Sequence, residues 1–167
     1  MAAGICQAAS AQDHWAPTQR IFCGQGTKAS PGTYTMATIV QPGVAVTEPL
    51  SRMGLVILRE PYTDYNCQVP RKALDQWKQV SEPVIVWPKV GETVITPVKD
   101  PKERVTMMVS AKIAGIKDQE FTLTDQKPRP FSCGEAAFST ENGTPALVGF
   151  YDCTKKALVS AQRFAHK

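Results

Sequence analysis

Short strand-like segments, separated by proline and glycine, dominate this sequence and restrict what it can fold into. The 167-residue chain contains 13 prolines and 11 glycines, and between them lie short runs rich in Val, Ile, Thr, Phe and Tyr. Such runs, bounded by turn-forming residues, are typical of β-strands. The predicted strands span residues 19–23, 32–40, 44–47, 54–58, 84–87, 92–97, 105–109, 113–116, 120–124, 136–140, 146–151 and 158–164.

One segment has helical spacing instead. In residues 72–80, KALDQWKQV, the side chains of Ala73, Leu74, Trp77 and Val80 fall on one face of a helix. This segment lies between two groups of predicted strands. We therefore predict an all-β protein of two barrel-like halves, residues 1–75 and 76–167, joined by one short helix.

Charge and hydropathy exclude some classes of partner. The formal net charge of +4 is mild, and no dense basic stripe is present, so a mixed solvated surface is expected. No apolar run is long enough to span a membrane, and the first 13 residues lack the basic start and apolar core of a signal peptide. We expect no membrane partner.

The cysteines indicate a reducing compartment. The five cysteines are widely and irregularly spaced, and none forms a CxxC pair: Cys6, Cys23, Cys67, Cys133 and Cys153. This pattern argues against a zinc knuckle and against a disulfide framework. We therefore predict a cytoplasmic protein with no metal site and no cofactor, in which most cysteines fill the core.

Cys133 allows two interpretations. It precedes Gly134 where a loop is expected to meet two strands, so it is either a buried core residue or an enzymatic nucleophile. Thiolate catalysis needs a base within hydrogen-bond reach and N–H donors for the oxyanion, and glycine favours such a loop. His14 and His166 are the only histidines, and His166 is penultimate. His14 is therefore the candidate base.

Residues 133–152, CGEAAFSTENGTPALVGFYD, resemble the nucleophile hairpin of the picornavirus 3C-type cysteine proteases, which have a chymotrypsin-like fold. PLSRMGLVILR (49–59) is similar to a first-barrel strand of that family, PRKALDQW (70–77) to its interbarrel helix, and SEPVIVWPKVG (81–91) to the entry of its second barrel. The resemblance implies two antiparallel β-barrels in a chymotrypsin-like arrangement. The short segment before His14 implies an abbreviated first barrel or a fragment.

The family resemblance also implies roles for individual residues. Cys133 attacks the scissile carbonyl and His14 takes its proton. Arg52 occupies the place of the family's acid, so either Glu48 replaces that acid or the site works as a dyad. The oxyanion loop comprises Phe131, Ser132 and Gly134, with Phe131 in place of a glycine, and the substrate pocket is lined by Tyr151 and Phe150. The implied function is a viral polyprotein-processing endopeptidase in the host-cell cytoplasm.

Three alternatives stay open at this point. The altered loop and the missing acid favour an inactive protease-like domain that binds RNA or protein, with Arg71 and Lys72 as weak RNA contacts. A second register places Asn142 where serine proteases carry their nucleophile, although Asn142-Gly143 is more typical of a hairpin turn. The third alternative is a β-sandwich coat-type protein with Cys133 buried.

Overall fold

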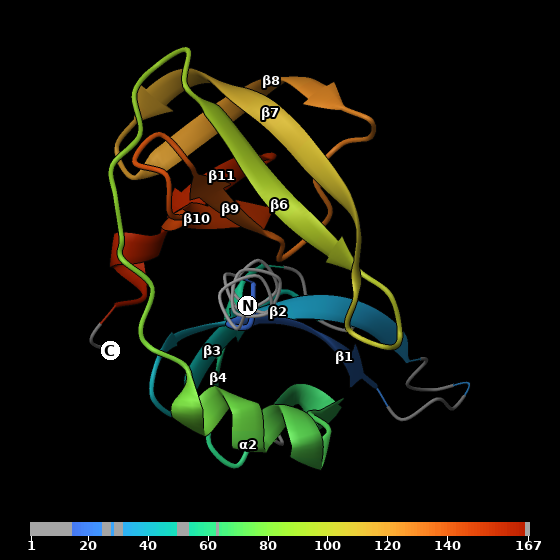
Figure 1. Ribbon diagram of the computed structural model, residues 1–167. Coiled ribbons are helices and arrows are strands. Elements are labelled where there is room, and N and C mark those ends of the chain that lie inside the picture. The colour runs from blue at the N-terminus through green and yellow to red at the C-terminus, as the bar shows by residue number, and fades with distance from the viewer. Residues whose placement is uncertain (1–14, 25–27, 29–31, 50–53, 63, 166–167) are drawn as a thin grey trace, which may run out of the picture.

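The computed structural model describes residues 15–24, 28, 32–49, 54–62 and 64–165. These residues form a mostly β protein of two units, a five-stranded sheet curved like half a barrel and a closed six-stranded barrel (Figure 1). This architecture confirms the predicted all-β, two-barrel class with an abbreviated first barrel. The alternative of a β-sandwich does not describe it, because the second unit closes on itself.

The first unit is an antiparallel sheet with the strand order β4-β3-β2-β1-β5. Its register places Cys23, the last residue of β1, opposite Cys67 of β5. A short 3-10 helix, η1, precedes β5. The elements are β1 (Thr18–Cys23), β2 (Thr33–Gln41), β3 (Val44–Thr47), β4 (Val56–Arg59), η1 (Asp64–Asn66) and β5 (Cys67–Gln68).

The second unit is a barrel closed in the order β10-β11-β8-β7-β6-β9. Strand β7 alternates buried and more exposed residues over much of its length, as expected for a strand with one face on a core, whereas β9 and β11 are buried throughout. It consists of β6 (Thr93–Lys99), β7 (Val105–Lys117), β8 (Glu120–Lys127), β9 (Ala136–Ser139), β10 (Ala146–Asp152) and β11 (Ala157–Ser160), followed by the 3-10 helix η2 (Ala161–Arg163).

The predicted connecting helix is present as α2 (Arg71–Gln79). Its apolar face packs against the first unit, where the Trp77 ring meets Tyr62 edge-on with ring centroids 5.3 Å apart. On the same side, the Gln19 amide donates a hydrogen bond of 2.7 Å to Gln76. The predicted boundary between residues 75 and 76 falls inside this helix, and the packing of Trp77 associates the whole helix with the first unit.

A shared hydrophobic cluster joins the two units. Trp15, ahead of β1, meets Phe138 of β9 edge-on at 5.2 Å, and Val46 of β3 lies in the same cluster as Phe150 of β10. The buried Lys99 ammonium adds a polar tie, since it donates hydrogen bonds to the carbonyl oxygens of Trp15 and Thr18. The site described below lies on this interface.

Several local expectations are changed by the structure. Residues 84–87, predicted as a strand, form only an isolated bridge between Ile85 and Leu147, and the strand predicted over 158–164 divides into β11 and η2. The segments predicted as strands 105–109 and 113–116 form one continuous strand, β7, because the residues between them also pair with β6. The Asn142-Gly143 hairpin turn is present, with Gly143 at φ 88° and its N–H bonded to the Thr140 carbonyl. The connection spans all residues between Ser139 and Ala146, so it is longer than a two-residue turn.

Candidate functional site between the two units

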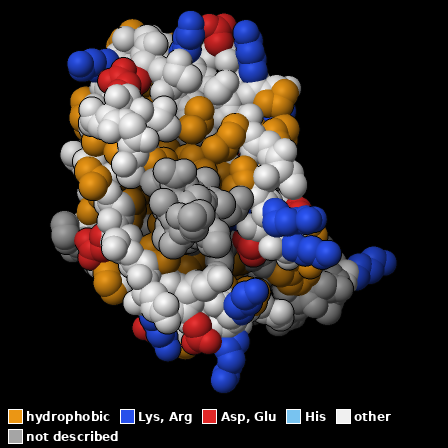
Figure 2. All heavy atoms as spheres, viewed as in Figure 1, with side chains coloured by type: hydrophobic (Ala, Val, Ile, Leu, Met, Phe, Trp, Pro, Cys, Tyr) orange, Lys and Arg blue, Asp and Glu red, His pale blue; other side chains and the backbone are white. Residues whose placement is uncertain are grey.

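A pocket of about 470 Å³ opens between the sheet and the barrel. Ligand pockets in proteins fall in this size range. Figure 2 shows hydrophobic side chains gathered in the middle of one face of the molecule, between the units, with most Lys and Arg side chains around its edge. The pocket is lined by Arg20, Thr33, Tyr34, Thr35, Met36, Glu48, Pro49, Val98, Lys99, Arg129, Ser132, Cys133, Glu135, Cys153 and Thr154.

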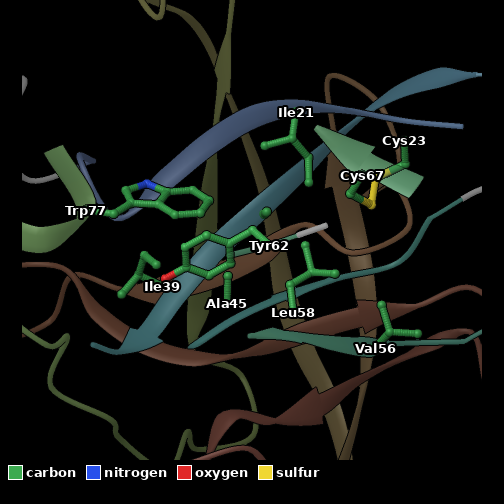
Figure 3. Close-up of a cluster of buried hydrophobic side chains, with 10 residues drawn as sticks. Ile21, Cys23, Ile39, Ala45, Val56, Leu58, Tyr62, Cys67 and Trp77 are labelled. Carbon is green, nitrogen blue, oxygen red and sulfur yellow. A yellow bond between two sulfur atoms is a disulfide. The ribbon is translucent and has the colours of Figure 1, made fainter. Parts of the chain in front are cut away.

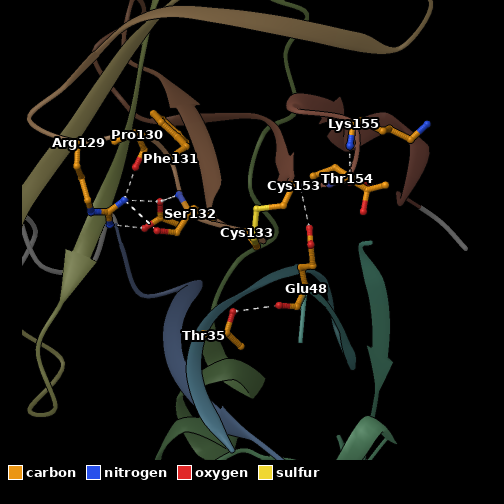
Figure 4. The surroundings of a disulfide bond; sticks show 12 residues. Thr35, Glu48, Arg129, Pro130, Phe131, Ser132, Cys133, Cys153, Thr154 and Lys155 are labelled. Carbon is orange, nitrogen blue, oxygen red and sulfur yellow. Dashed lines mark hydrogen bonds and ion pairs between the residues drawn. A yellow bond between two sulfur atoms is a disulfide. The ribbon is translucent and has the colours of Figure 1, made fainter. Parts of the chain in front are cut away.

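Cys133 lies on the wall of this pocket, but it is not a free thiol. Its sulfur is bonded to that of Cys153, which follows β10, and both residues are half-buried (Figure 4). A second disulfide joins Cys23 to Cys67. The expectation that the cysteines form no disulfides was therefore wrong. Their irregular spacing is uninformative because the strand pairing brings together residues that are distant in sequence.

The Glu48 carboxylate lies beside the Cys133–Cys153 disulfide, called the cleft disulfide below. Glu48 directly follows β3, its side chain is buried, and its Oε1 accepts a 3.1 Å hydrogen bond from the Cys153 N–H. Burial raises the pKa of Glu48, as does the nearby Asp152 carboxylate, while hydrogen bonds from the N–H groups of Cys153 and Gly54 oppose the shift. Glu48 thus lies beside both cysteines and is hydrogen-bonded to Cys153, and its catalytic role stays a prediction.

The three side chains form a compact group. One carboxylate oxygen of Glu48 and the sulfurs of Cys133 and Cys153 all lie within 4.8 Å of one another. Two thiolates and a carboxylate at this spacing are a ligand set that zinc accepts. In the disulfide form the sulfurs are bonded to each other, so they do not provide thiolate ligands.

The predicted oxyanion loop has its N–H groups directed elsewhere. Ser132 N–H donates to the Glu135 carboxylate at 2.5 Å, Gly134 N–H to the Tyr151 carbonyl at 2.8 Å, and Phe131 N–H to the Gln126 side chain at 2.7 Å. Oxyanion stabilisation requires donors aimed at the developing charge. In this conformation the three N–H groups are satisfied within the protein.

An ion pair holds the same loop. Arg129 binds Glu135 through two hydrogen bonds, of 3.1 and 2.8 Å, and also donates to the Ser132 hydroxyl at 3.1 Å. Hydrogen bonding to Glu135 raises the pKa of Arg129. Because Glu135 is 2% exposed, this two-point contact neutralises a buried carboxylate. Our sequence reasoning missed both residues, since nothing in their spacing marks them as partners.

The two predicted substrate-pocket residues belong to the core instead. Phe150 is fully buried in the cluster between the units, and Tyr151 packs on the barrel core with its ring 6.4 Å from that of Phe131. Neither lines the pocket. The prediction that they line the pocket is therefore corrected: Phe150 packs in the cluster between the units, Tyr151 packs against the barrel core on the opposite face of β10, and Cys153 and Thr154 line the pocket.

The remaining predicted residues lie away from the pocket or outside the described chain. His14, Arg52 and His166 are outside the described residues, as is Cys6. Arg71 and Lys72 are exposed in the first turn of α2 and do not line the pocket.

An aromatic and cationic pair forms one rim of the pocket. The Arg20 guanidinium lies 3.9 Å from the ring centroid of Tyr34, and Phe22 meets the same ring edge-on at 5.2 Å. Tyr34 is nevertheless 59% exposed, which is unusual for a large aromatic residue. A rim of this kind offers stacking and charge to a ligand.

Two comparisons with known proteins found no match. No protein-family model matches the chain, and no curated protein matches it. The class that the structure defines is therefore an all-β, two-unit fold with a disulfide-lined pocket between the units. Over the residues that the structure describes, no helix is long and apolar enough to cross a membrane.

Proposed function

We propose that the cleft binds an extended polypeptide segment, and that the chain does not cleave it while the Cys133–Cys153 disulfide is intact. The observation that carries the proposal is a strand edge on the pocket wall: at Thr33 and Tyr34 no described strand pairs with β2 on the β3 side, while the Thr35 hydroxyl already donates to the Glu48 carbonyl. Residues Thr33, Tyr34 and Thr35 of β2 line the pocket and pair with β1 on one side. On the other side, pairing with β3 starts at Thr38 among the described residues.

An open strand edge is a site for adding a strand. Alternate N–H and C=O groups of an antiparallel strand point away from its partner, and an extended peptide satisfies them by pairing. The exposed Tyr34 ring, backed by Arg20 and Phe22, provides a stacking surface next to that edge. Main-chain pairing would supply affinity, and the pocket would accept a side chain of the peptide.

Two features argue against hydrolysis in the disulfide form. A cysteine nucleophile acts as the thiolate, and the Cys133 sulfur is bonded to Cys153. The N–H groups of Ser132 and Gly134 are also satisfied internally, which leaves those donors unavailable for an oxyanion. These features favour the inactive protease-like domain among the predicted alternatives.

The test is selection of peptides from a random display library on the oxidised protein, followed by fluorescence anisotropy with the selected peptides. If the peptide adds as a strand, N-methylation of the residues whose N–H groups face β2 should lower affinity tenfold or more. N-methylation of the residues between them should change affinity little. Tyr34→Ala should weaken binding, whereas Val90→Ala, an exposed apolar residue outside the pocket, should not. Binding that is insensitive to N-methylation in both registers would contradict the proposal.

A second candidate is the predicted cysteine endopeptidase, active after reduction. The position of Cys133 on the pocket wall beside Glu48 favours it. Selected peptides should then be cleaved in dithiothreitol and left intact without it, and Cys133→Ala should abolish cleavage. His14→Ala tests the predicted base. No cleavage by the reduced protein at any pH would reject the endopeptidase and leave peptide binding unaffected.

RNA binding stays a separate proposal, resting on the exposed Arg71 and Lys72. With two basic residues, any affinity should be weak and should fall as salt is raised. Arg71→Ala with Lys72→Ala should remove it.

A further inference from the structure

The two disulfides lie in different surroundings. Cys23 and Cys67 are each 2% exposed and pack in the core of the first unit among Ile21, Leu58 and Val56 (Figure 3). Cys133 and Cys153 are half-buried and line the pocket. Thiol–disulfide exchange requires a thiolate to reach a sulfur. The two disulfides should therefore differ in their rate of exchange with a thiol, because they differ in exposure. A small thiol can approach the cleft disulfide in the folded protein.

The cleft disulfide also has a carboxyl group beside it. A carboxylate oxygen of Glu48 lies within 4.8 Å of both sulfurs, and the hydrogen bond from Cys153 N–H fixes Glu48 on the Cys153 side. Burial raises the pKa of Glu48. Asp152 also faces Glu48, and the charged pocket-lining side chains are Arg20, Lys99, Arg129 and Glu135.

Backbone packing holds this arrangement in place. The loop carrying Cys133 passes so close to β3 that a Cβ on Gly134 would lie 2.6 Å from the backbone nitrogen of Glu48. The hydrogen bond between Glu48 and Cys153 involves a backbone N–H, so breaking the S–S bond does not remove it. The acid and the two sulfurs are therefore held by contacts that do not depend on the S–S bond.

We propose that Cys133 and Cys153 form a redox-active pair that exchanges with a low-molecular-weight thiol, and that Glu48 supplies the proton to the departing sulfur. The pocket of about 470 Å³ has room for a small thiol. This proposal does not rest on peptide binding, because it requires the pocket and the disulfide but not pairing along the edge of β2.

The exchange proceeds in two balanced steps. A thiolate RS⁻ attacks Cys133 Sγ, forming a Cys133–S–SR bond and breaking the bond to Cys153, whose sulfur leaves as a thiolate. Glu48 transfers its proton to that thiolate. A second RS⁻ then attacks the RS sulfur of the mixed disulfide, releasing RSSR and the Cys133 thiolate, which takes a proton from water. The pair gains two electrons and two thiols are oxidised.

The first test uses reduced glutathione as the probe on the native, oxidised full chain. Samples are alkylated over time and the labelled cysteines are mapped by mass spectrometry. We expect Cys133 and Cys153 to be labelled at least tenfold faster than Cys23 and Cys67. In Cys153→Ser, where Cys133 is a free thiol, oxidised glutathione should form a mixed disulfide with Cys133 and release one molecule of reduced glutathione. Equal rates for the two disulfides, or reduction only in urea, would overturn the proposal.

The second test addresses Glu48. Glutamine is isosteric and still accepts a hydrogen bond, but it cannot give a proton. Glu48→Gln should slow reduction about tenfold at acidic pH, and the difference should shrink as pH rises and the parent Glu48 ionises. The matched control is Glu92→Gln, another buried acid that accepts a backbone N–H, from Lys89, outside the pocket. An unchanged pH profile in Glu48→Gln would reject its role.

Discussion

The Glu48 side chain, at the end of β3 in the sheet, accepts a hydrogen bond from the backbone N–H of Cys153, 105 residues later at the end of β10 in the barrel. The same stretch of chain packs directly against Gly134 in the neighbouring loop. The cleft disulfide and its acid are thus positioned by contact between the two units. Perturbing that contact should affect the stability of the protein and the site together.

Gly134→Ala should be strongly destabilising. Gly134 has φ +81°, and an added Cβ would lie 2.6 Å from the Glu48 nitrogen, which belongs to backbone and cannot swing aside. We expect a loss of about 2–4 kcal/mol in unfolding free energy, measured by urea titration. Gly143→Ala is the control, because Gly143 has φ +88° with open space around it and should cost only about 1 kcal/mol. Equal losses would show that backbone strain alone acts at both sites.

Arg129→Met should leave the buried Glu135 carboxylate without its cationic partner. The Arg129 side chain is 32% exposed, so part of the charge is screened, and we expect a loss of about 2–3 kcal/mol in unfolding free energy. Glu135→Gln in the same background should recover part of this loss, since it removes the uncompensated charge. The surface pair Arg104–Asp100 offers a comparison: Arg104 is 69% exposed, and Arg104→Met should leave stability unchanged within error.

Removing the Cys23–Cys67 disulfide should cost more stability than removing the cleft disulfide. The cysteines are 44 positions apart in the first pair and 20 in the second, so the first restricts the unfolded chain more. In the chain-entropy model, the losses are about 4 and about 3 kcal/mol for the two double alanine variants. Urea unfolding of both, without reductant, measures the difference. The reverse order would indicate that native packing around the cleft disulfide outweighs loop entropy.

The strand pattern in the sequence was sufficient to predict the fold class, while the pairing of side chains was not. Predicted strands 136–140 and 146–151 and the helix at 72–80 agree with β9, β10 and α2 within a residue or two. Local composition and periodicity determine such elements. The Cys23–Cys67 bond depends instead on the antiparallel register of β1 and β5, which bears no local signature.

For the candidate site, too, the sequence predicted some residues and missed others. Cys133 and Glu48 were predicted as site residues and lie together at the pocket. The roles expected for Tyr151 and Phe150 failed because they required the exact direction of β10 side chains relative to the barrel core. Glu135 and Arg129 were missed because an ion pair that satisfies a buried loop is visible only once the loop is folded.

Tyr62 should make the protein unfold in alkali. Its ring is 3% exposed and packs against Trp77, and burial, helped by the charge of Glu60, raises its pKa from 10.0 to about 12. A group whose pKa is raised in the folded state binds more protons there than in the unfolded chain. The contribution of Tyr62 to the free energy of unfolding is therefore complete below pH 10 and is lost as pH rises from 10 to about 12. The contribution is at most about 3 kcal/mol.

Tyr62→Phe should flatten the fall in stability over this window, whereas Tyr34→Phe, at an exposed site, should leave it unchanged. Urea titrations at intervals across the window give the measurement, and a slope that persists in Tyr62→Phe would assign the alkaline loss to other groups.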